Sequence, residues 1–407
     1  MNKPSKPKWE FSARFRARAF GGRSSRLACQ RVKEAVSEIS TVARKDPMLG
    51  AEGAIRFIEK LSPAIEEVDS SSGALGTAVN RALDALIPLI VEAPADPATR
   101  DAWLERLWDA FMADEIPYIE ALEDRWGELC ASPEVASRWA DELSPGLRAC
   151  WSGTSPGFRY FKGSTACLSA LLVAGRHQEL LDLLSLYKHS FWSYRRYGVK
   201  ALAAMGRKGE AIKYARESPG LNDHPQAVAE ACEEILLSSG MREEAYRQYA
   251  IMANRKTTHV ATFKAIAKKY PEQTPETILR DLVASTPRDE GKWFAAAKDA
   301  GLLDLALDLA RRSGADPRTL NRAARDFAAK EPRFSLGVAL ASIEWMALGY
   351  GYEITHGDVI MAYDEGLKAA QLLGVEAQMK QAVGDLIGKT GPGGTFVRSA
   401  LDYRLNR

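Results

Sequence analysis

Aromatic and basic side chains alternate in the first part of the chain, and this pattern is the one best suited to a binding chemistry. Arginines can neutralise phosphate groups, while aromatic rings can stack on unpaired bases. The pattern covers residues 1–23, which form a basic aromatic arm, and the start of the next segment: Trp9, Phe11, Arg14, Phe15, Arg16, Arg18, Phe20, Arg23 and Arg26. A nucleic-acid-binding arm would use Arg14, Arg16, Arg18, Arg23, Arg26 and Phe15.

Two other interpretations of the arm are open at this point. Its rings could dock on the first helical hairpin while its arginines pair with an acidic body, or its charge could contact an anionic membrane surface. Residues 1–33 hold ten Lys or Arg and only Glu10 as an acid, a balance of +9. Residues 34–407 carry a balance of −7, so the arm and the body differ in sign.

Metal chemistry needs a few residue types at tight spacing, and the sequence does not provide that spacing. No His-x-x-x-His pair and no Cys-x-x-Cys pair occurs. The five histidines are scattered: His177, His189, His224, His259 and His356. We therefore expect no metal site and no cofactor.

The segment Gly384–Thr390 looks at first like a phosphate-binding loop. Only three residues separate Gly384 from Gly388, where that loop needs four, and a helix rather than a strand precedes it. The segment therefore predicts a helix that ends at Gly388. A Gly-rich loop and a basic C-terminal tail, residues 389–407, would follow it.

Carboxylates and one aromatic loop are the remaining candidates for chemistry. Glu120, Glu123 and Asp124 stand beside Arg125, but acids on helices are usually solvated or paired with a base, so we name no catalytic residue. The loop at 349–356 could form a pocket with Tyr350, Tyr352 and His356, because loops often carry function. The alternative is that this loop fills a gap between hairpins.

These residues must be positioned by helices, because apolar residues recur three and four apart from about Ser24 onward and almost no alternating stretch occurs. A capping residue followed by proline marks five predicted helix starts. They are Asp96-Pro97, Ser132-Pro133, Thr274-Pro275, Thr286-Pro287 and Asp316-Pro317. The sequence predicts an all-α chain of roughly twenty helices without a sheet. A helical region at 24–160 would precede helical repeats at 161–388.

The repeats are marked by glycines that end one helix and open a tight turn into the next. The clearest copies are centred on Gly175, Gly206 and Gly240, and weaker copies on Gly301 and Gly374. An apolar residue precedes each glycine by four positions and another follows it by five, as two packed helices of a hairpin require. These residues are Leu171, Leu202, Leu236, Ala297 and Ala370 before the turn, and Leu180, Ala211, Ala245, Ala306 and Met379 after it.

This repeat resembles the tetratricopeptide-type helical hairpin, whose period is about 34 residues. The resemblance is clear over residues 165–250, although the early Trp of that family is absent from the clear copies. The whole chain, with stretches such as 289–301 and 349–355, also resembles a family of uncharacterised bacterial helical proteins, which implies no activity.

The resemblance implies an α-solenoid of antiparallel helical hairpins whose first helices line a concave face that binds peptides. It therefore implies a groove formed by Tyr194, Arg195, Arg196, Tyr197 and Lys200. The alternative is that the rings of this segment pack in the core while Arg195 and Arg196 are exposed.

Composition places the chain among globular proteins, with 46% apolar and 27% charged residues. The apolar runs are short, and even Ala85–Val91 is interrupted by Pro88, so we expect no transmembrane segment. No secretory signal is evident and the five cysteines are far apart, which favours a cytoplasmic location. The Arg- and Ser-rich start leaves an organellar transit peptide as the alternative.

These observations favour a non-enzymatic scaffold or adaptor that binds a protein or peptide partner on its concave face. The second hypothesis is a nucleic-acid-binding regulator that uses the basic arm. The third is an enzyme with a pocket at the loop 349–356.

Overall fold

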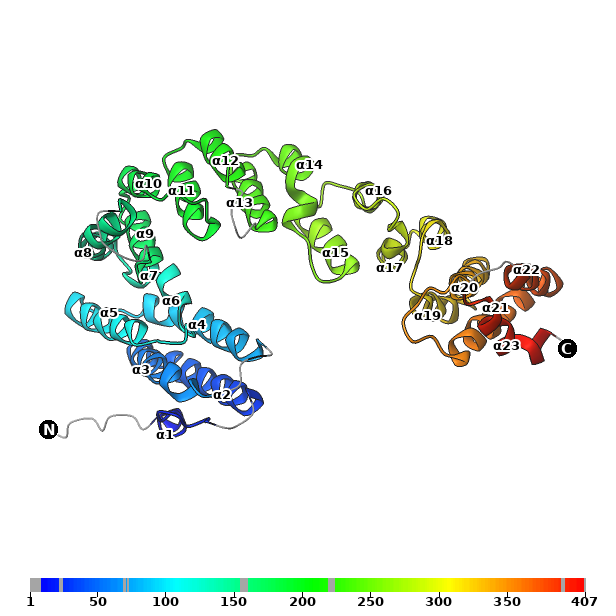
Figure 1. Cartoon of the computed structure of the whole chain (residues 1–407), viewed down its shortest axis with the longest axis horizontal. Helices are drawn as coiled ribbons and strands as arrows, with labels where there is room; N and C mark the ends of the chain where they lie inside the picture. Colours follow the sequence, from blue (N-terminus) through cyan, green and yellow to red (C-terminus); the bar gives the residue numbers. More distant parts are fainter. Residues whose placement is uncertain are drawn as a thin grey trace. The chain divides into compact units, whose positions relative to one another are not determined.

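The structure is a computed structural model that describes residues 9–21, 25–68, 71, 73–153, 160–218, 224–388 and 392–405. These residues form 23 α-helices and one 3-10 helix, and they contain no strand. The prediction of an all-α fold with roughly twenty helices is therefore confirmed (Figure 1). Their arrangement as one solenoid stays a prediction.

The chain divides into two compact units, Met1–Ile235 and Leu236–Arg407, and the division falls inside the predicted repeat region. The helices that begin in the first unit are α1 (Glu10–Arg14), α2 (Ser25–Ala43), α3 (Pro47–Ile65), α4 (Ala74–Glu92), α5 (Pro97–Met112), α6 (Ala121–Asp124), α7 (Trp126–Leu129), α8 (Pro133–Trp151), α9 (Ser164–Val173), α10 (His177–Leu186), α11 (Trp192–Ala204), α12 (Lys208–Arg216) and α13 (Pro225–Leu237).

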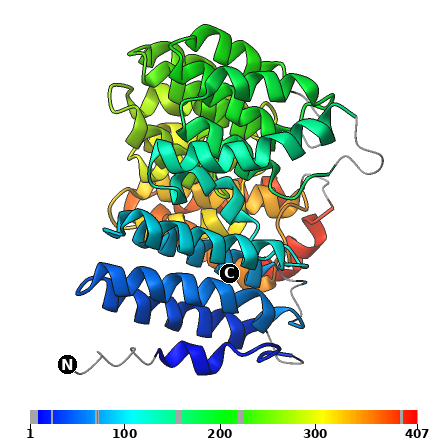
Figure 2. The same cartoon turned by 90° about the vertical axis from the view of Figure 1, so that its left-hand side faces the viewer.

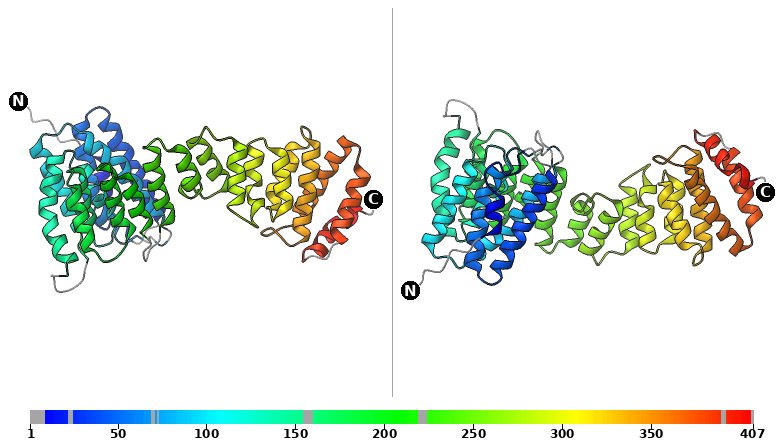
Figure 3. Two further views of the ribbon diagram at one scale, coloured as in Figure 1. Left: turned by 90° about the horizontal axis from the view of Figure 1, so that it is seen from above. Right: turned by 90° about the horizontal axis from the view of Figure 1, so that it is seen from below.

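The second unit contains ten α-helices and the short 3-10 helix. They are α14 (Arg242–Ala253), α15 (His259–Lys269), α16 (Pro275–Ala284), η1 (Glu290–Trp293), α17 (Phe294–Asp299), α18 (Leu303–Arg312), α19 (Pro317–Phe327), α20 (Pro332–Ala347), α21 (His356–Leu373), α22 (Glu376–Gly388) and α23 (Gly394–Leu405). Helices that follow one another in the chain pack together, as α17 with α18 and α20 with α21 (Figure 3).

Proline caps form at four of the five predicted positions. Asp96, Ser132, Thr274 and Asp316 each accept a hydrogen bond from the backbone N–H three residues later, and a helix begins at the following proline. The prediction for Thr286-Pro287 is wrong, because these residues lie in a turn. The Thr286 hydroxyl instead accepts a hydrogen bond from the Trp293 indole at 2.7 Å.

The five repeat glycines all adopt the left-handed conformation, with φ between 70° and 78°. In each copy the residue after the glycine donates its N–H to the carbonyl of the apolar residue four positions before the glycine, as Arg207 does to Leu202 at 2.9 Å. This is the Schellman termination of a helix. The apolar residues on both sides of every turn are buried. At Gly175, Gly206, Gly301 and Gly374 the two helices that flank the turn also pack together, as the repeat predicts.

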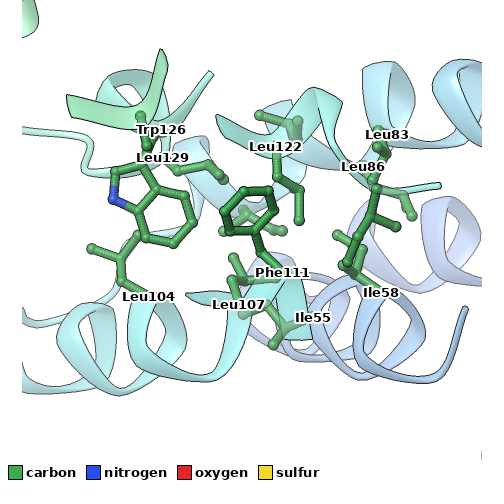
Figure 4. Close-up of a cluster of buried hydrophobic side chains, with 14 of the residues drawn as sticks. Ile55, Ile58, Leu83, Leu86, Leu104, Leu107, Phe111, Leu122, Trp126 and Leu129 are labelled. Carbon is green, nitrogen blue, oxygen red and sulfur yellow. The ribbon is translucent and has the colours of Figure 1, made fainter. Parts of the chain in front are cut away.

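One part of the core of the first unit lies between α3, α4 and α5 and continues onto the short helices α6 and α7 (Figure 4). Trp126 is fully buried, and its ring lies edge-on to Trp139 and Trp108, at centroid distances of 4.9 and 5.1 Å. A side chain at Gly127 would collide with the Ser169 carbonyl oxygen at 2.2 Å, so this glycine lets α7 lie close against α9.

One described helix, α4, is long and apolar enough to cross a membrane by length and composition alone. Leu75, Val79 and Leu83 are buried, and the helix packs against α2 and α3. The apolar face of α4 therefore packs in the core of the first unit, as the core helix of a folded domain does.

The C-terminal region differs from the predicted loop and tail. Helix α22 does end at Gly388, as expected, but residues 394–405 form α23. Val397 and Leu401 of α23 are buried in the core that it shares with α20, α21 and α22, and Arg404 pairs with Asp364 at 2.8 Å. Residues 389–391 and 406–407 lie outside the described part of the chain.

Candidate functional site

The aromatic residues of the N-terminal arm are buried in the first unit. Phe15 is 1% exposed, and its ring lies edge-on to Phe57 of α3 at 5.0 Å and to Phe20 at 5.3 Å. Trp9 lies over Gly53, where an added Cβ would approach the indole to 2.4 Å. The ring of Phe15 is therefore not a surface on which a base could stack.

Polar contacts hold the same arm in place. Glu38 of α2 accepts hydrogen bonds from the first two N–H groups of α1, at 2.8 and 3.1 Å. The N–H groups of Arg18 and Phe20 bond to the carbonyls of Pro63 and Ala64, which would otherwise be left unpaired at the end of α3. Figure 2 shows α1 alongside the first long helices of this unit.

The arginines of the arm also have partners on the body. Arg14 pairs with Glu34 at 2.9 Å, and Arg18 pairs with Glu67 at 3.2 Å. Arg16 and Arg26 are exposed, and Arg23 lies outside the described residues. For residues 9–21 the contacts are those of the docking alternative rather than of a nucleic-acid-binding arm.

The predicted groove residues on α11 are mostly occupied by contacts within the unit. Arg195 stacks on Tyr214 at 3.7 Å and donates to the Ser218 hydroxyl at 2.6 Å. Arg196 pairs with Asp124, and the Tyr197 hydroxyl donates to the Asp124 carbonyl at 3.1 Å. Tyr197 is 2% exposed, whereas Lys200 is exposed.

Of these groove residues, Arg195 also lines an open groove of about 600 Å³ between α10 and α12. The groove has charges of both signs, including Asp182, Glu210 and Lys213. Tyr194 points elsewhere and joins a ring cluster with Trp151 at 5.3 Å and Tyr187 at 5.1 Å. The two predicted aromatic groove residues, Tyr194 and Tyr197, therefore pack toward the preceding helices.

The three candidate residues of the loop at 349–356 have three different surroundings. Tyr350 packs edge-on against Trp345 at 4.9 Å and covers Gly314. Tyr352 is 80% exposed, and His356 packs on Phe396 of α23 at 4.7 Å. These contacts match the gap-filling alternative.

Metal-binding geometry is absent from the described residues, because no three His, Cys, Asp or Glu side chains lie together as ligands would. All five cysteines are free, and four of them are buried. Burial raises the pKa of the Cys167 thiol to about 11, so this thiol is not a reactive one.

Two buried side-chain oxygens without a hydrogen-bond partner among the described residues, on Glu123 and Thr165, lie where α6, α9 and α11 meet. We call this region the acidic junction and define it by Glu120, Glu123, Asp124, Tyr160, Thr165 and Tyr194. Asp124 is the structural member, because it accepts from Arg196 and Tyr197 of α11. The Ser169 hydroxyl bonds to the Asp124 carbonyl at 3.1 Å and to the Gly127 N–H at 3.0 Å.

Glu123 lies beneath this surface, 7% exposed, and its Oε2 atom has no hydrogen-bond partner among the described residues. Burial is the main cause that raises its pKa to about 7. The neighbouring charges of Asp124 and Glu120 add to the increase, while the hydroxyl and N–H of Thr165 oppose it. A buried carboxylate without a full set of partners is costly, so its presence calls for an explanation.

More exposed members of the junction lie near Glu123. Glu120 is exposed as a residue, but its carboxyl group is partly desolvated. This desolvation, followed by the charges of Asp124 and Asp114, raises its pKa. Tyr160 is 58% exposed, and burial together with the charges of Glu123 and Glu120 raises its pKa. The junction thus combines carboxylates with tyrosine rings, a combination that favours a positively charged group.

The basic side chains that the structure describes around the junction already have other partners. Arg196 is paired with Asp124, and Lys162 donates to the carbonyls of Met112 and Asp114 at 3.0 and 2.8 Å. Neither forms a described hydrogen bond with Glu123. The carboxylate therefore lacks a counter-charge within the described part of the unit.

Sequence reasoning found the three carboxylates but not the burial of one of them. The available signal was spacing, because Glu123 stands four residues after Ile119 and three before Trp126, both fully buried, and such spacing is typical of one face of a helix. An acid on an apolar face is a candidate for a perturbed group. Thr165 and Tyr160 gave no local signal, because only the tertiary fold brings them to Glu123.

Comparison with known proteins gives no relative from which a role could be transferred. No family model, curated protein or solved structure matches this chain.

Proposed function

We propose that this chain is a protein-interaction scaffold that binds a basic segment of a partner protein at the acidic junction. The observation that carries the proposal is the buried carboxylate of Glu123, whose Oε2 atom has no hydrogen-bond partner among the described residues, beside exposed Glu120 and Tyr160. A lysine or arginine side chain would supply the missing hydrogen bonds and the missing charge.

The chemistry of the junction favours an organic cation over a metal ion. The described acids do not converge as three ligands, which a site for a bound divalent ion would require. The tyrosine rings of Tyr160 and Tyr194 are instead suited to the stem and head of a long basic side chain.

The surrounding helices support a binding role because they are fixed. Asp124 ties α6 to α11, and Gly127 and Ser169 hold α7 against α9. A partner side chain would therefore meet a preorganised surface and lose little affinity to rearrangement of the scaffold.

The experiment is an array of short peptides probed with the purified chain and with two variants. Peptides that bind should contain Lys or Arg, and replacement of that residue by Ala should remove binding. Glu123→Gln should weaken binding by tenfold or more, because a hydrogen bond to a charged group contributes about 1.5–3 kcal/mol.

Glu128→Gln is the matched control. Glu128 lies on the adjoining helix α7, is exposed and pairs with Arg125, so its replacement should leave binding unchanged. Peptides that bind without a basic residue, or equal binding by Glu123→Gln, would show that the junction is not the binding site.

A further inference from the structure

A second surface of the first unit carries basic instead of acidic side chains. An open groove of about 500 Å³ runs between α2 and α4, a volume within the range of about 300–1,000 Å³ that is typical of ligand sites. The groove is lined mainly by apolar atoms, and none of the side chains lining it is acidic. Its lining residues belong to α2 and α4, and none of them is part of the acidic junction.

The groove has an apolar floor contributed by both helices. Val32 and Val36 of α2 and Ala78 and Ala82 of α4 lie along it, with Val32 and Ala82 almost fully buried. The lining residues on α4, from Ala74 to Ala82, span about 12 Å at 1.5 Å per residue. That length matches about two turns of a helix laid along the groove.

A basic residue stands on each side of this floor. Lys33 of α2 and Arg81 of α4 both line the groove and are exposed. Neither forms an ion pair with another described residue, whereas nearby Arg31 pairs with Glu34. The two sides of the groove therefore carry positive charge that the described part of the unit does not neutralise.

We infer that this groove binds an amphipathic α-helix of a partner protein whose apolar face is flanked by Asp or Glu. The apolar floor would receive side chains at positions i, i+3 or i+4, and i+7, which is how helices dock in grooves. Lys33 and Arg81 would pair with acids on the two flanks. A single-headed lipid would place its charge at one end of the groove, whereas here one cation stands on each helix.

The test uses a displayed library of helical peptides of about 15 residues, selected on the full chain. Selected peptides should combine an apolar stripe with flanking acids. Ala78→Trp, which fills the groove from a half-exposed position, should abolish their binding. The double variant Lys33→Glu with Arg81→Glu should weaken binding about tenfold or more, and peptides with Lys in place of Glu should recover it.

Two further measurements distinguish a peptide bound in the groove from an effect of misfolded variants. Arg26→Glu changes an exposed charge on α2 that does not line the groove, so peptide binding should be retained. Cys29 lines the groove and is the one half-buried thiol, whereas the other four cysteines are buried. A bound peptide should therefore slow alkylation of Cys29 in the unmodified chain.

Three results would overturn the inference. The selected peptides could bind Ala78→Trp as tightly as they bind the unmodified chain, or they could bind the double variant Lys33→Glu with Arg81→Glu with unchanged affinity. The third result is that a bound peptide does not slow the alkylation of Cys29. Binding of dodecanoate or of anionic vesicles with the expected charge dependence, in the absence of any groove-dependent peptide, would assign the groove to a lipid instead.

Discussion

Replacement of Glu123 by glutamine should change how the stability of the first unit depends on pH. The buried carboxyl has a pKa of about 7 in the fold against an ordinary value of 4.5. Between these values the folded chain holds a proton that the unfolded chain has lost. Stability therefore falls as pH rises through this range, and below pH 4.5 the group has no effect.

The magnitude follows from the two pKa values. Above pH 7 the ionised carboxylate costs the fold about 3 kcal/mol relative to a group with an ordinary pKa. Glutamine is neutral at every pH and avoids this cost. The free energy of unfolding of Glu123→Gln should therefore equal that of the unmodified chain near pH 4.5 and exceed it by about 3 kcal/mol at pH 8.

Urea unfolding at several pH values, followed by tryptophan fluorescence, measures this difference. Trp126 reports on the relevant region because it lies one turn from Glu123 in the ring cluster with Trp108 and Trp139. Glu128→Gln should show no such pH-dependent difference. A difference between Glu123→Gln and the unmodified chain that stays constant from pH 5 to pH 8 would refute the reasoning.

Three further predictions concern the turns, the arm and the second unit. Gly206→Ala should lower the free energy of unfolding by only about 1–2 kcal/mol, because the site is open and only the left-handed backbone opposes a side chain. Gly127→Ala should lower it by about 3 kcal/mol or more, because the new methyl group would collide with Ser169. Chemical denaturation of both variants measures these differences. Phe15→Ala should destabilise the first unit by about 3–5 kcal/mol while Arg16→Ala changes stability by less than about 0.5 kcal/mol, and equal effects would contradict the docked arm. Burial, followed by the charge of Lys292, lowers the pKa of His259, so the second unit should lose stability as pH falls below 6.5. His259→Gln should reduce that loss, as measured from the fluorescence of Trp293, whose ring His259 contacts at 4.5 Å.

Features that depend on a few consecutive residues were predictable from the sequence. Gly206 marks a left-handed turn because its conformation is a local property, and Leu202 and Ala211 follow from the same hairpin geometry. The Asp316-Pro317 cap is local in the same way. Thr286-Pro287 shows the limit, because the indole of Trp293 uses the hydroxyl that would have capped a helix.

Features that depend on burial were less accessible. The rings of the arm allowed three interpretations, because nothing local to Phe15 indicates that Phe57 of α3 will cover it. Tyr197 was predicted to line a groove, but its hydroxyl donates a hydrogen bond to the carbonyl of Asp124, more than seventy residues earlier in the chain. Glu123 was visible as an acid, yet its raised pKa arises from desolvation by the tertiary fold.

The empty space around the repeat glycines has a practical consequence for engineering. At Gly175, Gly206, Gly240, Gly301 and Gly374 an added Cβ would meet no atom within 4 Å. Exposed turns of this kind are the places where a chain best tolerates added segments. A reporter domain or a protease site could therefore be tested at these turns, although an insertion directly after the glycine would displace the N–H that closes the Schellman hydrogen bond.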